Sequence, residues 1–141
     1  MQRIIKFKAF SKATSKMMDW EFIRSVGNLN KLIALNHIEL LQFTGLTDGF
    51  GEDIYEGDIY REIDPIDDEE GIDNINYFVC VFMEQIASFV WITTDEYNIS
   101  KHHDWPEDDE LPYSLNSEDM SRIKIIGNVF ENPKMLIDKG L

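Results

Sequence analysis

The sequence is poor in cysteine, in basic residues and in long apolar runs. Cys80 is the only cysteine among 141 residues, which excludes an intramolecular disulfide and a metal site built from several cysteines. No segment approaches the ~18 consecutive apolar residues that a membrane-spanning helix needs. The first ten residues, MQRIIKFKAF, lack the uninterrupted apolar core of a signal peptide. We therefore expect a cytoplasmic protein that makes no membrane contact.

The shortage of bases is uneven along the chain. The sequence has 13 Lys and Arg against 27 Asp and Glu, for a net charge of −14. Residues 1–36 hold seven bases and two acids, residues 37–119 two bases and 23 acids, and residues 120–141 four bases and two acids. Because nucleic-acid binding relies on Lys and Arg displacing counterions, this field predicts no direct nucleic-acid binding. It suits a basic partner or a metal ion, although most acidic surfaces are only solvated.

Apolar and aromatic residues are plentiful enough to build a core. Hydrophobic residues make up 43% of the chain and aromatic residues 12%, which argues against a disordered acidic tail. The length predicts a single domain over residues 1–141, with two small lobes sharing a core as the open alternative. Cys80 stands inside an aromatic and β-branched run, where we expect it to be a small buried hydrophobe.

Alternating or β-branched segments predict a mainly β protein with at most short helices. The predicted strands are 3–10, 38–43, 54–60, 76–83, 86–93 and 123–130, with a turn at Thr44-Gly45 and a strand break near Glu84-Gln85. Residues 20–36 fit either a helix or a hairpin that turns at Gly27-Asn28. We expect 117–119 to cap a short helical turn around Met120.

The stretch GEDIYEGDIY, residues 51–60, combines two glycines with four acids. Glu56-Gly57-Asp58 interrupts the alternation, so we expect Gly57 to bend the chain before the strand resumes at Ile59. The same reasoning makes the glycines of residues 48–51 turn residues with positive φ angles. The acids of this stretch are expected to face water.

Three segments in order resemble a known family. RIIKFKAF near the start, QFTGL followed by IYEGDI in the middle, and IIGNVFENP near the end are similar to the YopX family of phage and prophage proteins. Phe10-Ser11 departs from the Trp-Asp often found there, and residues 20–36 and 61–120 follow no recognisable pattern of the family. The resemblance implies a small SH3-like β-barrel or roll with inserted acidic loops, and a bacterial host. It implies no catalytic residue.

Histidines and clustered acids are candidate metal ligands. His102, His103 and Asp104, with Asp95 or Glu107, would form a site if a loop brought them together. The acidic runs 67–70 and 107–110 lack the alternating ligands and central glycine of a calcium loop, and adjacent acids do not form a two-metal nuclease site. Solvated loops are the favoured interpretation of both, so no catalytic, cofactor-binding or metal-ligating residue is assigned.

Aromatic side chains offer a different kind of site. Small barrels bind peptides in aromatic-lined grooves, for which the chain offers Trp20, Tyr55, Tyr60, Trp91 and Trp105. The favoured interpretation is that most of these are core residues. We also expect residues 3–8 and 122–124 to lie together as first and last strands of a barrel. They would form a basic edge that uses Arg3, Lys6, Lys8, Arg122 and Lys124.

No catalytic motif is found in the sequence. The leading hypothesis is therefore a non-enzymatic accessory protein that needs no cofactor and binds a host or phage protein, with self-association left open. One alternative is an acidic decoy that occupies a host DNA-binding protein. Another is a metal-dependent hydrolase using His102, His103 and nearby acids.

Overall fold

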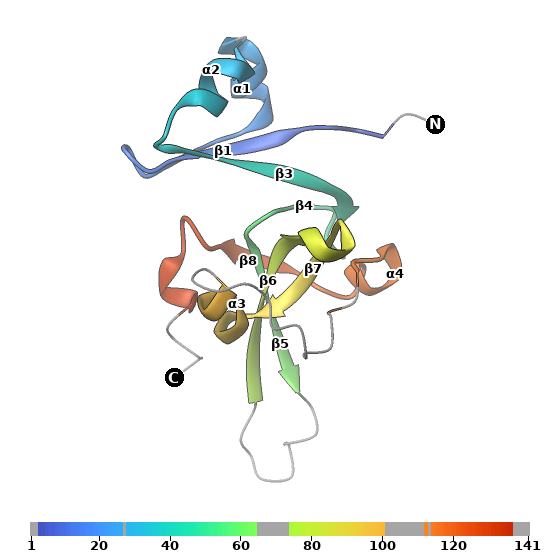
Figure 1. The fold of residues 1–141 in the computed structure, drawn as a ribbon. Coiled ribbons are helices and arrows are strands. Elements are labelled where there is room, and N and C mark those ends of the chain that lie inside the picture. Colours follow the sequence, from blue (N-terminus) through green and yellow to red (C-terminus); the bar gives the residue numbers. More distant parts are fainter. Residues whose placement is uncertain (1–2, 27, 65–73, 101–111, 113, 137–141) are drawn as a thin grey trace.

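Two antiparallel sheets make up most of the molecule. The computed structural model of the chain describes residues 3–26, 28–64, 74–100, 112 and 114–136. In this part of the chain, eight strands form two four-stranded sheets with the orders β2-β1-β3-β4 and β7-β6-β5-β8 (Figure 1). One of the two sheets curls into a half-barrel. The mainly β fold class, with a small SH3-like roll and only short helices, is confirmed.

The first sheet contains the N-terminal strands. Its members are β1 (Phe7–Ser11), β2 (Lys16–Met18), β3 (Ile38–Thr47) and β4 (Asp53–Tyr55). The predicted turn at Thr44-Gly45 is wrong, because both residues lie inside β3. Gly45 has φ +90°, and the β3–β4 register shifts between Phe43 and Thr47. This glycine therefore forms a bulge within a continuing strand.

Two short helices lie within residues 20–36, which resolves the alternative left open by the sequence. Helix α1 (Trp20–Val26) begins where Asp19 Oδ1 accepts the N–H of Phe22 at 2.8 Å. Helix α2 (Leu29–Ala34) begins where Asn28 Oδ1 accepts the N–H of Lys31 at 3.1 Å. Both caps satisfy backbone donors that a helix start leaves free. The two helices lie on the face of the first sheet that points away from the second sheet (Figure 1).

The second sheet carries the longer strands. It consists of β5 (Asp58–Asp64), β6 (Asn74–Met83), β7 (Ser88–Thr93) and β8 (Ile125–Asn128). The break expected near Glu84-Gln85 is confirmed by the 3-10 turn η2 (Glu84–Ile86), which joins β6 to β7. Strand β5 lies between β6 and β8, so its two neighbours come from distant parts of the sequence.

Short helical segments cover this sheet. Helix α3 (Thr94–Ser100) follows β7 directly and was not predicted. The expected helical turn around Met120 is confirmed as α4 (Ser117–Met120), although Asn116 is the residue that caps it. A last 3-10 turn, η3 (Pro133–Leu136), follows β8. None of the helices described is long and apolar enough to cross a membrane.

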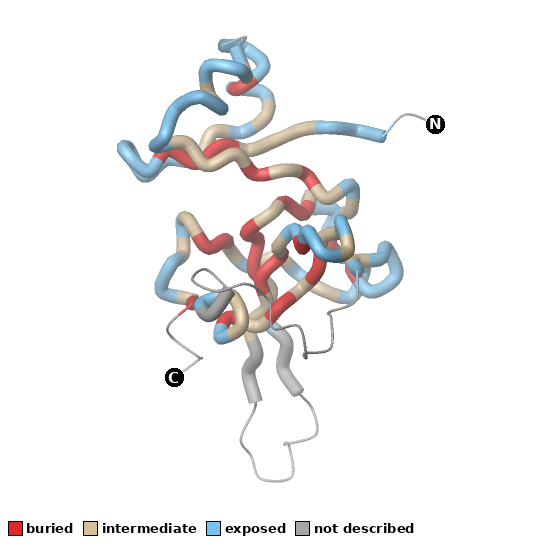
Figure 2. The backbone as a smooth tube through the Cα atoms, viewed as in Figure 1, coloured by how far each residue is buried: buried red, intermediate tan, exposed pale blue. Residues whose placement is uncertain are grey.

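Buried residues occur along the strands of both sheets (Figure 2). One cluster contains Ile59, Val79, Val129 and Leu136, and another contains Ile54, Cys80 and Met120. Val79 and Cys80 are neighbours in β6 and therefore point to opposite faces. Cys80 is fully buried, which confirms its predicted role. A single domain over residues 1–141, or two lobes sharing a core, stays a prediction.

The predicted basic edge is wrong. Strand β1 pairs with β2 and β3, whereas β8 pairs with β5 in the other sheet. The chain leaves the first sheet after β4, so the first and last strands never become neighbours in one barrel. Lys6 Nζ instead lies 2.6 Å from Asp53 Oδ2, and Lys8 Nζ lies 4.6 Å from the centre of the Tyr55 ring.

Candidate functional site

The segment Glu56-Gly57 carries the chain from one sheet to the other. The single strand predicted over 54–60 is divided into β4 and β5, which belong to different sheets. Gly57 has φ +84°, as expected for a bend. Its N–H donates to Cys80 O at 2.8 Å, and its carbonyl accepts the N–H of Val129 at 2.9 Å. This one residue thus joins β6 to the segment that follows β8.

The acids beside Gly57 are tied to backbone amides. Glu56 Oε1 accepts the N–H of Gln42 at 3.0 Å, and Asp58 Oδ2 accepts the N–H of Tyr55 at 2.8 Å. The expectation that the acids of this stretch face water is therefore wrong for Asp58, whose exposed fraction is 5%. A carboxylate can occupy such a place because it receives a hydrogen bond that replaces one from water.

Burial perturbs the titration of this segment. It raises the pKa of Asp58 to about 7, against the opposing effects of the Tyr55 N–H and Lys8, while Glu52 and Asp48 raise it further. Burial also raises the pKa of Glu56. The pKa of the Cys80 thiol is raised well above its ordinary value by burial, with Asp58 and Glu56 adding to the effect. This thiol stays protonated and is not a nucleophile.

Hydrogen bonds from backbone amides to the side chain of Asp48 hold the turn between β3 and β4. Asp48 accepts the N–H groups of Phe50, Glu52 and Ile125, each at 2.9 Å. Burial raises the pKa of Asp48, but these bonds and Lys124 outweigh burial and hold the pKa below its ordinary value. Asp48 therefore organises the turn between the two middle segments of the family resemblance, QFTGL and IYEGDI.

Asn128 plays the same part at the end of β8. Its Oδ1 accepts the N–H of Phe130 at 3.0 Å and that of Glu131 at 2.8 Å. Asn132 Oδ1 in turn accepts the N–H of Asn128 at 3.1 Å. These bonds fold the segment Asn128-Val129-Phe130 back so that Phe130 packs 5.4 Å from Phe10 of the first sheet, measured between ring centres. The closing motif thus connects the two sheets.

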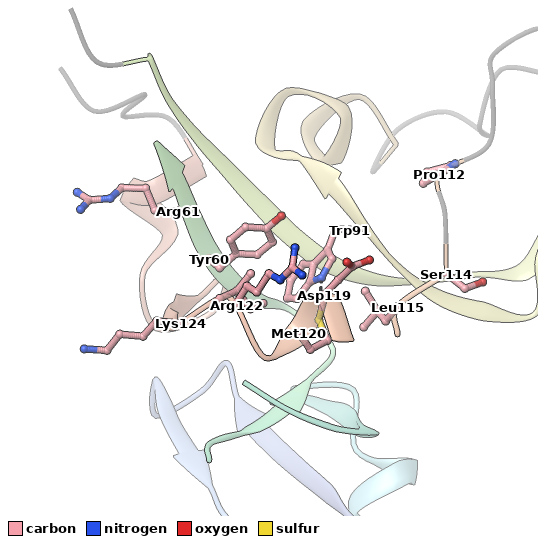
Figure 3. A pocket seen from close by; sticks show the side chains of 11 residues that line it. Tyr60, Arg61, Trp91, Pro112, Ser114, Leu115, Asp119, Met120, Arg122 and Lys124 are labelled. Atoms are coloured by element: carbon pink, nitrogen blue, oxygen red, sulfur yellow. Dashed lines mark hydrogen bonds between the residues drawn. The ribbon is translucent and has the colours of Figure 1, made fainter. Parts of the chain in front are cut away.

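A pocket of about 750 Å³ opens over one face of the second sheet (Figure 3). We call it the Tyr60–Trp91 groove. It is lined by Tyr60, Arg61, Trp91, Pro112, Ser114, Leu115, Asp119, Met120, Arg122, Ile123 and Lys124. The ring centres of Tyr60 and Trp91 lie 4.7 Å apart at an interplanar angle of 79°, and Tyr60 also stacks on Phe78 at 5.0 Å.

Strand register places these aromatic rings together. Tyr60 pairs with Phe78 across β5 and β6, and Cys80 pairs with Trp91 across β6 and β7. Phe78 and Cys80 are two residues apart in β6, so all four side chains share one face. Helix α4 covers the Cys80 end of that face, where Trp91 Nε1 donates to Met120 Sδ at 3.1 Å. The Tyr60 end is left open as the floor of the groove.

The groove also gathers basic side chains. Arg122 Nη2 lies 3.6 Å from Glu118 Oε1, in a pair whose side chains are 73% and 82% exposed. Lys124 Nζ lies 5.1 Å from the centre of the Phe50 ring. Arg61 extends from β5, and Asp119 adds an acid to the lining. An aromatic floor with a cationic rim suits an elongated ligand that is partly apolar and partly anionic.

The aromatic residues proposed from the sequence separate in the structure. Tyr60 and Trp91 meet in the groove, and Trp105 lies outside the described residues. Tyr55 is buried, and with Trp20 it lines a smaller cavity of about 320 Å³ beside Lys6 and Lys8. Of the bases that line the groove, Arg122 and Lys124 were predicted only as members of the basic edge, which does not form. Arg61 is missed because nothing in its neighbourhood in the sequence marks it.

The proposed metal ligands and acidic runs fall largely outside the described residues. This holds for His102, His103, Asp104 and Glu107, and for the runs 67–70 and 107–110. Asp95 is described and lies in the first turn of α3. Within the described ranges, no group of three or more His, Cys, Asp or Glu side chains could hold a metal ion.

Comparisons with known proteins agree with this architecture. A crystal structure of protein EF1440 from Enterococcus faecalis is similar with a TM-score of 0.58 and 18% identity, over 96% of this chain and 99% of that one. At that identity the likeness concerns the fold alone. A search among curated proteins found no match. The model of the YopX protein family matches residues 6–137. The chain therefore belongs to the YopX protein family.

Proposed function

We propose that this protein is a non-enzymatic binding module that holds an extended segment of a partner protein in the Tyr60–Trp91 groove. The observation that carries the proposal is the groove itself, a pocket with an aromatic floor on one face of the second sheet. Following the family resemblance, the partner is a protein of a phage or of its bacterial host. The proposed place of action is the cytoplasm of that host.

The groove has the size and chemistry of a peptide-binding surface. Its volume of about 750 Å³ is enough for a few side chains. Tyr and Trp dominate the energetics of protein interfaces because their large, stiff rings bury much area for little entropy. Trp91 and Tyr60 are fixed by the contacts with Met120 and Phe78, so a ligand would meet a preorganised surface.

Two features favour binding over catalysis. The acids with raised pKa values, Glu56 and Asp58, are anchored to backbone amides and lie outside the groove lining. The one thiol, Cys80, is fully buried beneath α4 and β4 residues. Neither group has access to a substrate in the groove. The alternative of a metal-dependent hydrolase would depend on His102 and His103 instead.

An acidic decoy is the second candidate, and the charge layout favours it. Residues 37–119 carry 23 acids and two bases, a density that resembles a row of phosphates. Such a protein would compete with duplex DNA for a basic host protein. Competition binding with a host DNA-binding protein and a labelled duplex separates this candidate from the groove binder, which leaves the duplex bound.

Blocking the groove tests the proposal. Ser114 is exposed and lines the groove, so Ser114→Trp fills it without removing a core side chain. Ser117→Trp places the same side chain on an exposed residue three positions away that does not line the groove. Short random peptides displayed on yeast are selected with the wild-type protein and then measured against both variants.

The two variants should behave differently. We expect peptides selected by the wild-type protein to bind the Ser114→Trp variant at least about tenfold more weakly and the Ser117→Trp variant unchanged. Thermal melting confirms that both variants are folded. If no peptide is enriched above background, or if the selected peptides bind both variants as well as the wild type, the groove is not a peptide-binding site.

A further inference from the structure

Basic side chains on the second sheet are concentrated at one place. Between residues 37 and 136, the described bases are Arg61, Arg122, Lys124 and Lys134. The first three line the Tyr60–Trp91 groove. In a chain with a net charge of −14, three of these four bases line one pocket and concentrate positive charge there. The groove is thus marked out by charge as well as by shape.

These bases are available to a ligand. Among the side chains that the structure describes, no carboxylate lies within ion-pair distance of Arg61 or Lys124. Arg122 has only the long contact to Glu118, between two strongly exposed side chains. An exposed pair of this kind contributes little and is exchanged at small cost. The rim therefore offers up to three cationic groups to an incoming anion.

The spatial order of the groups suggests the shape of the ligand. Tyr60 and Trp91 form the floor. Figure 3 shows Arg122 between these two rings, and Arg61 and Lys124 beyond Tyr60 with their charged ends directed away from Trp91. A ligand that satisfies both needs an apolar side chain over the rings and anionic groups beside it. Adjacent residues of an extended chain project alternately and supply such a pattern.

We infer that the Tyr60–Trp91 groove selects acidic, extended segments of the partner protein, with carboxylates paired to Arg61, Arg122 and Lys124 and an apolar side chain on the aromatic floor. This inference rests on the proposed function and adds the chemical class of the ligand. The inference is based on charge complementarity. A protein that is otherwise acidic repels acidic peptides, except where the basic side chains of Arg61, Arg122 and Lys124 attract them.

Single-stranded nucleic acid is a less suitable occupant. Binding of that kind needs free aromatic faces for base stacking and a long basic track for the phosphates. Tyr60 already stacks on Phe78 and packs at 79° against Trp91, so its ring is not free to hold a base in a sandwich. Three bases also give too few phosphate contacts to overcome the net charge of −14.

The composition of selected peptides tests the inference. Displayed random peptides are selected at about 0.15 M salt with three proteins: the wild type, the triple variant Arg61→Ser/Arg122→Ser/Lys124→Ser, and the control Lys12→Ser/Lys16→Ser/Arg24→Ser. The control removes the same charge from exposed residues of β2, α1 and the turn after β1. Both triple variants therefore carry the same net charge, and only the location of the lost charge differs.

The expected result is a local effect of charge. The wild type and the control should enrich Asp and Glu severalfold over the input library, and the groove variant should lose that enrichment and bind the selected acidic peptides about tenfold more weakly. Peptides that are blocked by Ser114→Trp but carry no excess of acids would overturn the inference and leave the proposed function standing. Failure to select any groove-dependent peptide overturns both. Binding of a labelled single-stranded oligonucleotide that Ser114→Trp abolishes would assign the groove to nucleic acid.

Discussion

Replacing Gly57 by alanine separates two reasons why glycine is needed between the sheets. The first is conformational, since φ at this residue is +84°. The second is steric: a Cβ atom would lie 3.1 Å from Phe130 Cε2 and 3.3 Å from Val129 Cγ2. Both carbons belong to the segment whose backbone bonds to Gly57, so these neighbours have little freedom to retreat.

The expected loss of stability follows from these two terms. A positive φ costs an alanine roughly 1–2 kcal/mol. Forcing a methyl group against packed side chains costs roughly 1–3 kcal/mol more. The lower entropy of the unfolded alanine chain returns about 0.5 kcal/mol. We therefore expect Gly57→Ala to lower the free energy of unfolding by about 2–4 kcal/mol.

Gly51→Ala is the matched control. Gly51 has φ +82°, close to that of Gly57, but an added Cβ would meet nothing within 4 Å. It should therefore show the conformational cost without the steric one, about 0.5–1.5 kcal/mol after the same entropy term is subtracted. Urea unfolding of both variants, followed by tryptophan fluorescence, gives the two free energies, provided that the slopes with urea agree. An equal loss in both variants would remove the steric term, and no loss in either would refute the backbone argument altogether.

Three further predictions concern charge. Because the pKa of Asp58 is raised to about 7, the folded state binds an extra proton between about pH 4 and pH 7, and stability falls as pH rises through that window. Asp58→Asn should remove most of this pH dependence and raise the free energy of unfolding at pH 8 by up to roughly 4 kcal/mol relative to wild type. Urea unfolding of both proteins at pH 4.5 and pH 8 measures it, and an equal change in the free energy of unfolding between the two pH values in both proteins would contradict the prediction. Asp48→Ala strands three backbone N–H groups and should cost about 2–4 kcal/mol in thermal or urea unfolding, more than Asp48→Asn, which keeps one acceptor oxygen. The protein should not be retained on duplex DNA at about 0.15 M salt, and retention that falls with added salt would contradict the charge argument.

The local sequence pattern was sufficient to predict the hairpin of β6 and β7. The run of aromatic and β-branched residues on either side of Glu84-Gln85 has few helical alternatives, and the structure places its turn there. The bend at Gly57 was equally visible, because glycine between two acids leaves few conformations for a regular strand. What the pattern could not reveal was that the strands on its two sides join different sheets, since pairing partners are chosen by distant residues.

The helices were harder to predict for identifiable reasons. Helix α2 has Leu29, Leu32 and Ile33 at helical spacing but buries none of its residues, and Gly27-Asn28 before it made a hairpin an equal alternative. Helix α3 is only seven residues long, but hydrogen bonds mark its start: Thr93 Oγ1 accepts the N–H of Glu96, and Glu96 Oε1 accepts the N–H of Thr93. This reciprocal pair is a capping box, which the spacing of Thr93 and Glu96 in the sequence already indicates.

The groove could not have been predicted from spacing along the chain. Its floor joins Tyr60 of β5 to Trp91 of β7, and its rim adds Arg122 from the segment before β8. Tyr60 and Trp91 were two of five aromatic candidates in the sequence, but nothing in the sequence brought these two together or placed Arg122 beside them. The site exists only because β5 has β6 on one side and the segment leading to β8 on the other.

The position of β5 between an early and a late partner also bears on how the chain folds as it is synthesised. Strand β6 can pair with β5 soon after both leave the ribosome, but β8 reaches it only when residues 125–128 have been made. Until then one edge of β5 is open and Asp48 lacks the Ile125 N–H that it holds 77 positions away. Closing such a long loop is slow, and an unpaired edge invites pairing with other chains. Nascent or C-terminally truncated chains should therefore be the aggregation-prone forms of this protein, because in them β8 has not yet covered the open edge of β5.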